Sequence, residues 1–474
     1  MKIYWADSSI FIVTSEGIFK SDSSGVTSDS DTIYHINAAT FDGTSSFYLT
    51  GVLDSSGSRI PYVRKLSLEL QEEFLQLIPV TSSYAPIPKS IVKGGNGRIF
   101  IAGSAYDSTL FPSNVQYFAG IDSAGNVAWS YVYGIGPDEQ AFKMMKCDHS
   151  GNAVIGSDVG LSGPSAGEMH YRKFDSSGNI LHENLFDPVY ARDLLSDIDF
   201  GTAGQTFLTG PFNLTGIIGN TSSALVIFDS SGLFSSFSTF DGYGYDERQH
   251  ILADGNGYLY GIVSGTDHSG PRDSHFDIMK FEETGTQTWS TRNRNGSITY
   301  QKADALKLSR NGKLFVVGEH RDDTLSVRSG LIAVYDTSGA IEYELIEDYP
   351  GFDVIYTDML DLTDSVYFLL GSYTSTSTTD RTVLAKYGYT TTSIPEMASS
   401  SPTMIYPNPA TNVFHVQVSG KITTVMISDV AGHSIKSFQV CDNGFYNISD
   451  LPTGCYMVTV FTDQGVCRSR LLVE

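Results

Sequence analysis

The sequence is poor in positive charge and cysteine, and it has no long apolar run. Its 30 Lys and Arg residues stand against 53 Asp and Glu residues, which gives a net charge of −23. A field of that sign repels phosphate backbones and anionic lipids, so we expect no nucleic-acid partner. No apolar stretch approaches the roughly 18 residues that a membrane-spanning helix needs, so we expect no transmembrane segment.

Cysteine is scarce, and its placement is uneven. Cys147 stands alone, whereas Cys441, Cys455 and Cys467 lie close together near the C-terminus. Three cysteines in one small domain allow one bridge in any of three pairings and leave one thiol over. No C-x-x-C motif or nearby histidine pair accompanies them, so we expect neither a metal nor a cofactor.

The first residues, Met1–Asp7, lack the apolar region and the cleavage motif of a signal peptide. Long Ala/Leu/Glu/Lys stretches and helix-period patterns are also missing. Gly, Ser, Thr, Tyr and Phe are plentiful instead, and this composition indicates an all-β protein.

A short turn of the form Asp-Ser-Ser-Gly recurs at a fixed interval. An apolar strand ends at each copy and another begins after it, as expected for a hairpin in which aspartate caps the turn and glycine takes the positive φ. The glycines of the five copies lie 53 or 54 residues apart, at Gly125, Gly178, Gly232, Gly285 and Gly339. The chain is therefore a repeat array.

Each period holds four strand signals, for example Ala141–Cys147, Asn152–Ile155, Met169–Phe174 and Ile180–Phe186. Four antiparallel strands per unit of about 50 residues are typical of a β-propeller blade. Seven such units fit between residues 36 and 389, the last with three strands. The first 34 residues form a shorter unit, either an eighth blade or the strand that closes the last one. We favour eight blades over seven.

The second strand of several units ends in glycine, where we expect the backbone to be crowded or sharply bent. The positions are Gly103, Gly210, Gly261 and Gly318.

The strand and turn grammar resembles that of secreted bacterial β-propeller repeat proteins, most closely over Tyr117–Asn126. A second resemblance is to quinoprotein-type blades, which carry a Gly…Trp pair near the outer strand. Only Gly125…Trp129 and Gly285…Trp289 keep that pair, so we interpret both as blade packing and expect no quinone.

The repeat stops at a polar segment with two prolines, so we divide the chain into a propeller (1–390), a linker (391–403) and a C-terminal domain (404–474). About seven short strands in the last segment fit a small Ig-like β-sandwich. Its motifs are Tyr-Pro-Asn-Pro, Ile-x-Asp-x-x-Gly, Leu-Pro-x-Gly-x-Tyr and a basic apolar end. Their residues are Tyr406, Pro407, Asn408, Pro409, Asp429, Gly432, Leu451, Gly454, Tyr456 and Arg470.

These ordered motifs resemble the type A C-terminal sorting domain of the type IX (Por) secretion system of Bacteroidota. Arg470 stands where the family usually has lysine, and the three cysteines are not part of its pattern. The resemblance implies an interaction with the secretion machinery and a secreted or cell-surface location. It also implies an N-terminal export signal, so we expect that the upstream end is missing from this sequence or that its start is miscalled.

No catalytic motif is recognisable, and we assign no catalytic residue. The repeated aspartates lack the alternating spacing of calcium ligands. The strongest local cluster is on three loops predicted to share one rim of the ring, where it can bind a metal, a sugar or a peptide or be solvated surface. Its residues are Tyr243, Tyr245, Asp246, Asp267, His268, Asp273, His275, His320 and Asp322.

Two classes of function remain. The favoured one is a non-catalytic module that binds a glycan, peptide or protein outside the cell. The alternative is a propeller hydrolase or lyase with carboxylates converging at the central funnel. The inner strands end in residues such as Lys93 and Phe200, and we find only Asp358 and Asp361 acidic there.

Overall fold

The computed structural model divides into two compact units, Met1–Gly388 and Tyr389–Glu474. It describes residues 1–7, 9–21, 27–31, 35–55, 58–79, 85–106, 114–133, 140–160, 168–186, 194–212, 222–240, 245–266, 274–293, 299–322, 328–348, 352–363, 366–375, 381–388, 404–418, 421–428, 434–439, 444–462 and 465–473. Each unit is described separately below.

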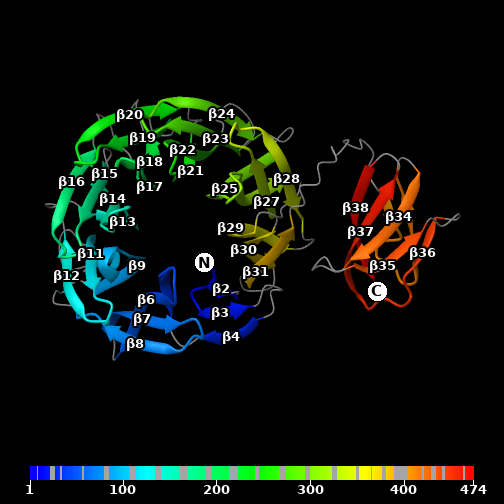
Figure 1. Ribbon diagram of the computed structural model, residues 1–474, viewed down its shortest axis with the longest axis horizontal. Coiled ribbons are helices and arrows are strands. Elements are labelled where there is room, and N and C mark those ends of the chain that lie inside the picture. The colour runs from blue at the N-terminus through cyan, green and yellow to red at the C-terminus, as the bar shows by residue number, and fades with distance from the viewer. Residues whose placement is uncertain are drawn as a thin grey trace. The chain divides into compact units, whose positions relative to one another are not determined.

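The first unit is a ring of antiparallel blades, with the first strand of each blade nearest the centre (Figure 1). In the described residues we count eight blades, so the preference for eight over seven is confirmed. Blades 1 to 4 consist of β1 (Lys2–Ala6), β2 (Ser9–Val13), β3 (Ile18–Ser21), β4 (Thr27–Asp31); β5 (Ile36–Phe41), β6 (Ser46–Ser55), β7 (Ser58–Ser67), β8 (Glu72–Leu77); β9 (Ala85–Lys93), β10 (Ile99–Tyr106), β11 (Asn114–Ile121), β12 (Val127–Tyr133); and β13 (Gln140–Cys147), β14 (Ala153–Val159), β15 (Glu168–Phe174), β16 (Ile180–Phe186).

Blades 5 to 8 continue the same order. They consist of β17 (Asp197–Phe200), β18 (Thr206–Phe212), β19 (Ser222–Phe228), β20 (Phe234–Phe240); β21 (Tyr245–Ala253), β22 (Tyr258–Thr266), β23 (Ser274–Glu282), β24 (Gln287–Asn293); β25 (Thr299–Leu308), β26 (Leu314–Asp322), β27 (Arg328–Tyr335), β28 (Ile341–Glu347); and β29 (Phe352–Thr363), β30 (Val366–Ser375), β31 (Arg381–Gly388). A 3₁₀ turn, η1 (Gly95–Gly97), joins β9 to β10.

The N-terminal strands pair with one another in the order β1-β2-β3-β4. The alternative that part of this segment closes the last blade is therefore wrong, and blade 8 has three strands in the described residues. The reason is visible in the hairpin registers, because Ala6 pairs with Ser9 and Val13 with Ile18, so short turns hold the four strands in one local sheet.

The recurring turn has the predicted chemistry. Asp122 Oδ1 accepts hydrogen bonds from the backbone N–H groups of Ala124 (3.0 Å) and Asn126 (2.8 Å), and Gly125 has φ of +93°. The copies at Asp175, Asp229 and Asp336 are capped in the same way. The repeated aspartate therefore serves as the cap of the turn in these copies.

In blades 3 and 7, glycine in the second strand is required by a bulge in the innermost strand, whereas a Cβ at Gly261 would make only ordinary contacts, so the expected crowding is wrong there. In blade 3 the register of β10 and β9 shifts between Ala102 and Gly103, and a Cβ at Gly103 would overlap the carbonyl oxygen of Ile87. Gly318 is crowded in the same way by the carbonyl of Lys302. A substitution at either position would force the bulge to move.

Apolar residues fill the spaces between blades, so each blade completes its neighbour's core. The seam between the first and last blades packs Ile3, Ile10 and Ile12 against Phe368 and Leu370. Burying a side chain of this size contributes about 1.5–3 kcal/mol. The ring is therefore closed by hydrophobic burial.

An inner carboxylate links three consecutive blades at two places in the ring. Asp197 of blade 5 contacts Lys146 of blade 4 (2.8 Å) and accepts a hydrogen bond from the N–H of Ile251 in blade 6 (3.1 Å). Asp358 of blade 8 does the same with Lys307 of blade 7 (3.2 Å) and the N–H of Ile3 in blade 1 (3.4 Å). Blade 1 thus meets blade 8 with the geometry of an ordinary blade pair.

The second unit is a β-sandwich of two sheets, in agreement with the predicted Ig-like domain. One sheet has the order β32-β33-β36 and the other β35-β34-β37-β38. The strands are β32 (Met404–Tyr406), β33 (Val413–Gln417), β34 (Ile422–Ser428), β35 (Ser434–Gln439), β36 (Phe445–Asn447), β37 (Gly454–Thr462) and β38 (Gly465–Val473).

The motifs of this unit have structural roles. Asn408 donates a hydrogen bond to the carbonyl of Arg470 (2.8 Å) and accepts one from the N–H of Leu472 (2.8 Å), which ties the first segment to the last strand. The Tyr456 hydroxyl donates to the carbonyl of Pro452 (2.7 Å). Asp429 and Gly432 lie outside the described residues.

Candidate functional site

The predicted rim is described only in part. Tyr243, Asp267, His268 and Asp273 lie outside the described residues. For Tyr245, Asp246 and Asp322 the structure describes the backbone, at the start of β21 and the end of β26, but not the side chain. The rim as a whole stays a prediction.

The two described histidines of the rim are buried and lie on different interfaces. His275 lies on the same face of β23 as Met279 and Phe281, and these two residues pack against blade 5. His320 lies on the same face of β26 as Leu314 and Val316, and these two residues pack against blade 6. The structure therefore does not bring these two imidazoles together. Among the described residues, no three His, Cys, Asp or Glu side chains lie close enough to hold a metal ion.

A pocket of about 430 Å³ lies between blades 7 and 8. It is lined by the starts of the inner strands β25 and β29, by the ends of β26 and β30 and by the start of β27. All but one of its lining residues are polar or charged: Tyr300, Lys302, Asp304, Glu319, Arg321, Arg328, Ile355, Thr357 and Ser372.

Two cross-strand rows of blade 7 build much of this lining. Arg321 pairs with Tyr300 on one side and with Arg328 on the other. In the next row, Glu319 pairs with Lys302 and with Gly330. Residues opposite one another share a face of a sheet, so the two rows point to the same side of the blade.

Carboxylates hold one of the arginines in place. Arg328 Nη1 lies 3.2 Å from Glu319 Oε2, and the Arg328 backbone N–H donates to Asp353 Oδ1 (2.8 Å). Glu319 is buried, whereas Arg328 is exposed at its outer side. Asp353 belongs to β29, so this contact also joins blade 7 to blade 8.

Sequence reasoning reached this segment but selected its other face. It chose His320 and Asp322, whereas alternation along β26 places Glu319 and Arg321 together on the face toward blade 8. The period of two in the run Glu319–Asp322 was the signal that separates the two pairs.

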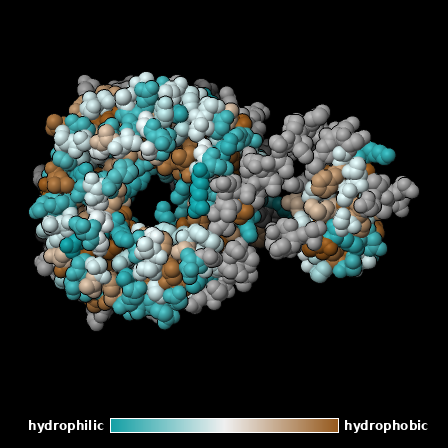
Figure 2. All heavy atoms as spheres, viewed as in Figure 1, coloured by the Kyte–Doolittle hydropathy of each residue, from teal (hydrophilic) through white to brown (hydrophobic). Residues whose placement is uncertain are grey.

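Acidic residues of the inner strands are more numerous than expected. The statement that only Asp358 and Asp361 are acidic is wrong, since Asp197 and Asp199 lie on β17 and Asp304 on β25. A hole at the centre of the ring is visible in Figure 2. Asp197 and Asp199 accept hydrogen bonds from blade 6 backbone, so both connect neighbouring blades.

The pKa values of these two carboxylates are shifted in opposite directions. Burial opposes ionisation of Asp197, but the Lys146 charge and the hydrogen bonds from His250 and Lys146 hold its pKa below the usual range. Burial raises the pKa of Asp199, and the Lys146 charge only partly offsets that effect.

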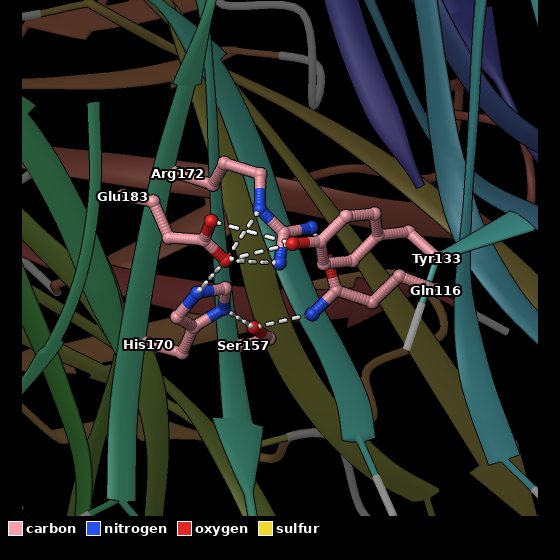
Figure 3. A network of polar contacts seen from close by, with 6 residues as sticks. All are labelled: Gln116, Tyr133, Ser157, His170, Arg172 and Glu183. Atoms are coloured by element: carbon pink, nitrogen blue, oxygen red, sulfur yellow. Dashed lines mark hydrogen bonds and ion pairs between the residues drawn. The ribbon is translucent and has the colours of Figure 1, made fainter. Parts of the chain in front are cut away.

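A second polar cluster has the order of a catalytic triad but no access for a substrate (Figure 3). Ser157 Oγ lies 3.0 Å from His170 Nδ1, and His170 Nε2 lies 3.2 Å from Glu183 Oε1. Ser157 is 0% exposed and His170 is 1% exposed. A nucleophile must be reachable, so we interpret the cluster as structural.

The same cluster joins blade 3 to blade 4. Gln116 donates to Ser157 Oγ (2.6 Å), and the Arg172 guanidinium lies 3.5 Å from the centre of the Tyr133 ring and 2.7 Å from Glu183. Burial and the Arg172 charge lower the pKa of His170 to about 4, so the ring is neutral at pH 7. This network could not be predicted from the sequence, because its residues are spread over five strands.

The fold and the pocket define a β-propeller that carries a separate β-sandwich. Residues 404–474 match the family described as a secretion system C-terminal sorting domain, Por_Secre_tail. The resemblance stated from the motifs is confirmed. The protein is therefore directed by its tail to the type IX secretion machinery, and its location is the cell surface or the extracellular medium.

Solved structures similar to this chain include propeller proteins of diverse activity. Polysaccharide lyase Uly1 is 12% identical, with 70% of this chain and 89% of that chain covered and a TM-score of 0.41. Sqt1 from Chaetomium thermophilum is 10% identical, with 77% and 91% covered and a TM-score of 0.46. An endo-arabinase from Bacteroides thetaiotaomicron VPI-5482 is 12% identical, with 51% and 92% covered and a TM-score of 0.28.

Because these identities and scores are low, we base no functional argument on them. No curated protein matches the chain. In the described residues, no helix is long and apolar enough to cross a membrane.

Proposed function

We propose that the exported propeller is a non-catalytic binding module that takes a glycan, peptide or protein ligand outside the cell. The observation that carries this proposal is the pocket of about 430 Å³ between blades 7 and 8. Its volume falls in the range of small-ligand sites, and its lining offers hydrogen-bond donors and acceptors from four side chains or more.

The pocket favours binding over acid–base catalysis. Glu319 is buried and its carboxylate is paired with Arg328 at 3.2 Å, which suits a structural role. The other carboxylate of the lining, Asp304, lies on the inner strand β25. A hydrolase of the two-carboxylate type needs one carboxyl group free to donate a proton, whereas Glu319 is held by Arg328.

The test is a ligand screen with the whole chain and one pocket variant. We expect binding on a glycan or peptide array that weakens at least tenfold when Thr357→Trp fills the pocket. The matched control is Thr288→Trp on the outer strand β24 of blade 6, where the side chain is exposed and does not line the pocket. Binding that survives Thr357→Trp unchanged would place the ligand elsewhere on the ring.

The alternative, an extracellular hydrolase or lyase, has one observation in its favour, since Asp304 and Glu319 line one pocket. It predicts that a polysaccharide found in the screen is cleaved. Size-exclusion chromatography of that polysaccharide after incubation measures this. Loss of chain length with the wild type, and none with Asp304→Asn, would establish the enzyme.

A further inference from the structure

Two arginines lie directly opposite each other at the mouth of the pocket. Arg321 near the end of β26 pairs in register with Arg328 at the start of β27, and both line the same pocket. Side chains opposite each other in an antiparallel pair are neighbours, and like charges there are destabilising. Such a pair is retained at a cost unless negative charge lies between or beside it.

Among the described residues, carboxylates form ion pairs with one of the two arginines. Arg328 is paired with Glu319 (3.2 Å) and lies near Asp353 (3.9 Å). The ion pairs formed within the described ranges do not include Arg321, whose side chain is exposed. Lys302 adds a third cation to the lining. Against these three cations stand the two carboxylates of the lining, Asp304 and Glu319, so the lining has a formal charge of +1 in a chain of net charge −23.

We propose that the pocket between blades 7 and 8 binds the oxyanion group of an acidic glycan, with Arg321 and Arg328 as its two anchors. This proposal rests on the binding function proposed above and adds the class of ligand. A guanidinium matches a carboxylate or sulfate group with two parallel hydrogen bonds. An anion between the two arginines relieves their mutual repulsion, which is the reason for a pair in this register.

The rest of the lining suits a sugar better than an acidic peptide. Thr357 and Ser372 offer hydroxyl groups, Tyr300 offers a ring on which a sugar can stack, and Ile355 is the one purely apolar residue. A peptide would bring apolar side chains that this lining cannot bury. The ligand is therefore a sugar that carries a carboxylate or sulfate.

The experiment is calorimetric titration of the full chain with a panel of oligosaccharides that contain galacturonate, glucuronate or sulfated galactose. Each is compared with its neutral counterpart, and acidic peptides are titrated alongside. We expect an acidic member to bind at least tenfold more tightly than its neutral counterpart, and raising the salt from 20 to 200 mM should weaken it.

Variants assign the anchors. Arg321→Gln should weaken acidic binding by about tenfold or more without a change in fold, because Arg321 is exposed. Arg328→Gln should also weaken acidic binding by about tenfold or more. The matched control, Arg292→Gln, removes an arginine that is ion-paired with Asp277 (2.9 Å) in blade 6, and it should leave binding unchanged.

The failures of the two proposals are distinguishable. Neutral glycans bound as tightly as acidic ones, or Arg321→Gln without effect, would overturn the anion site and leave the binding function standing. If acidic peptides bind and acidic oligosaccharides do not, the assignment of the ligand as a glycan is wrong. If no acidic member binds, the anion site is wrong, and if the array is also blank, the binding function is wrong with it.

Discussion

Replacement of Asp197 and Asp199 by asparagine, one at a time, should separate two carboxylates that lie two residues apart on β17. Asp197 contacts Lys146 at 2.8 Å and accepts the N–H groups of Ile198 (2.8 Å) and Ile251 (3.1 Å). Asp199 accepts the N–H of Ala253 (2.8 Å) and has no ion pair as close as that of Asp197 among the described contacts. Asparagine keeps an oxygen for these N–H groups and removes the charge.

The magnitude follows from the exposure of the ion pair. Two unit charges about 4 Å apart attract by about 4 kcal/mol at an effective dielectric constant of about 20. The Asp197 side chain is 8% exposed but that of Lys146 is 37% exposed, so solvent screens part of this attraction. We expect Asp197→Asn to lower the free energy of unfolding by about 2–3 kcal/mol. That is below the roughly 3–5 kcal/mol that follows when one partner of a buried pair is removed.

Asp199→Asn should be neutral or stabilising at pH 7. Burial raises the pKa of Asp199, so its charged form is disfavoured in the folded state, and wild-type stability falls as pH rises from about 3.9 through that raised pKa. The pKa of Asp197 is lowered, so its stabilisation is full above about 3.9 and disappears as pH falls through the lower, folded-state pKa.

The assay is urea unfolding of the full chain, followed by tryptophan fluorescence at pH 7 and again at pH 3.5. All three tryptophans, Trp5, Trp129 and Trp289, lie in the propeller, so the signal reports that unit without the sorting domain. The difference between wild type and Asp197→Asn should shrink at the lower pH. Equal destabilisation by the two variants at pH 7, or none by Asp197→Asn, would refute the assignment of their environments.

Three other outcomes are expected. Gly103→Ala should destabilise the propeller by about 2 kcal/mol or more in the same assay, because its Cβ would overlap the carbonyl of Ile87. Asn408→Ala should lower the stability of the sorting domain by about 0.5–1.5 kcal/mol, measured by circular dichroism melting, because it removes the two hydrogen bonds that tie the first segment to the last strand. If the linker is the processing site, mass spectrometry of the released protein should find a C-terminus within 390–403, and a released chain ending at Glu474 would contradict cleavage.

The repeat and the tail could be predicted from the sequence because their signals are local. A turn such as Asp175–Gly178 needs an aspartate and a glycine at fixed positions. The spacing of its copies gives the length of one blade. The motif around Asn408 is equally local, and its hydrogen bonds to the last strand explain the residue type.

The pocket and the buried network could not be predicted, because both depend on strands from different blades. Arg328 and Asp353 come together through the packing of blade 7 on blade 8, and neither has a local sequence mark. The network around His170 needs Gln116 from the preceding blade. His275 and His320 do not lie together, because alternation along their strands directs them to different blade interfaces. The rest of the rim stays a prediction.

The last blade has three strands in the described residues, so its outer edge differs from that of the other blades. In blades 5 and 7 the third strand is buried along nearly its whole length, as in Ser223–Phe228 and Ser329–Tyr335, because a fourth strand covers it. In β31 the residues Val383–Ala385 are only half-buried, and among the described residues no strand pairs with its outer edge. Backbone amides on that edge should exchange with solvent first, so the ring should begin to open at its C-terminal blade.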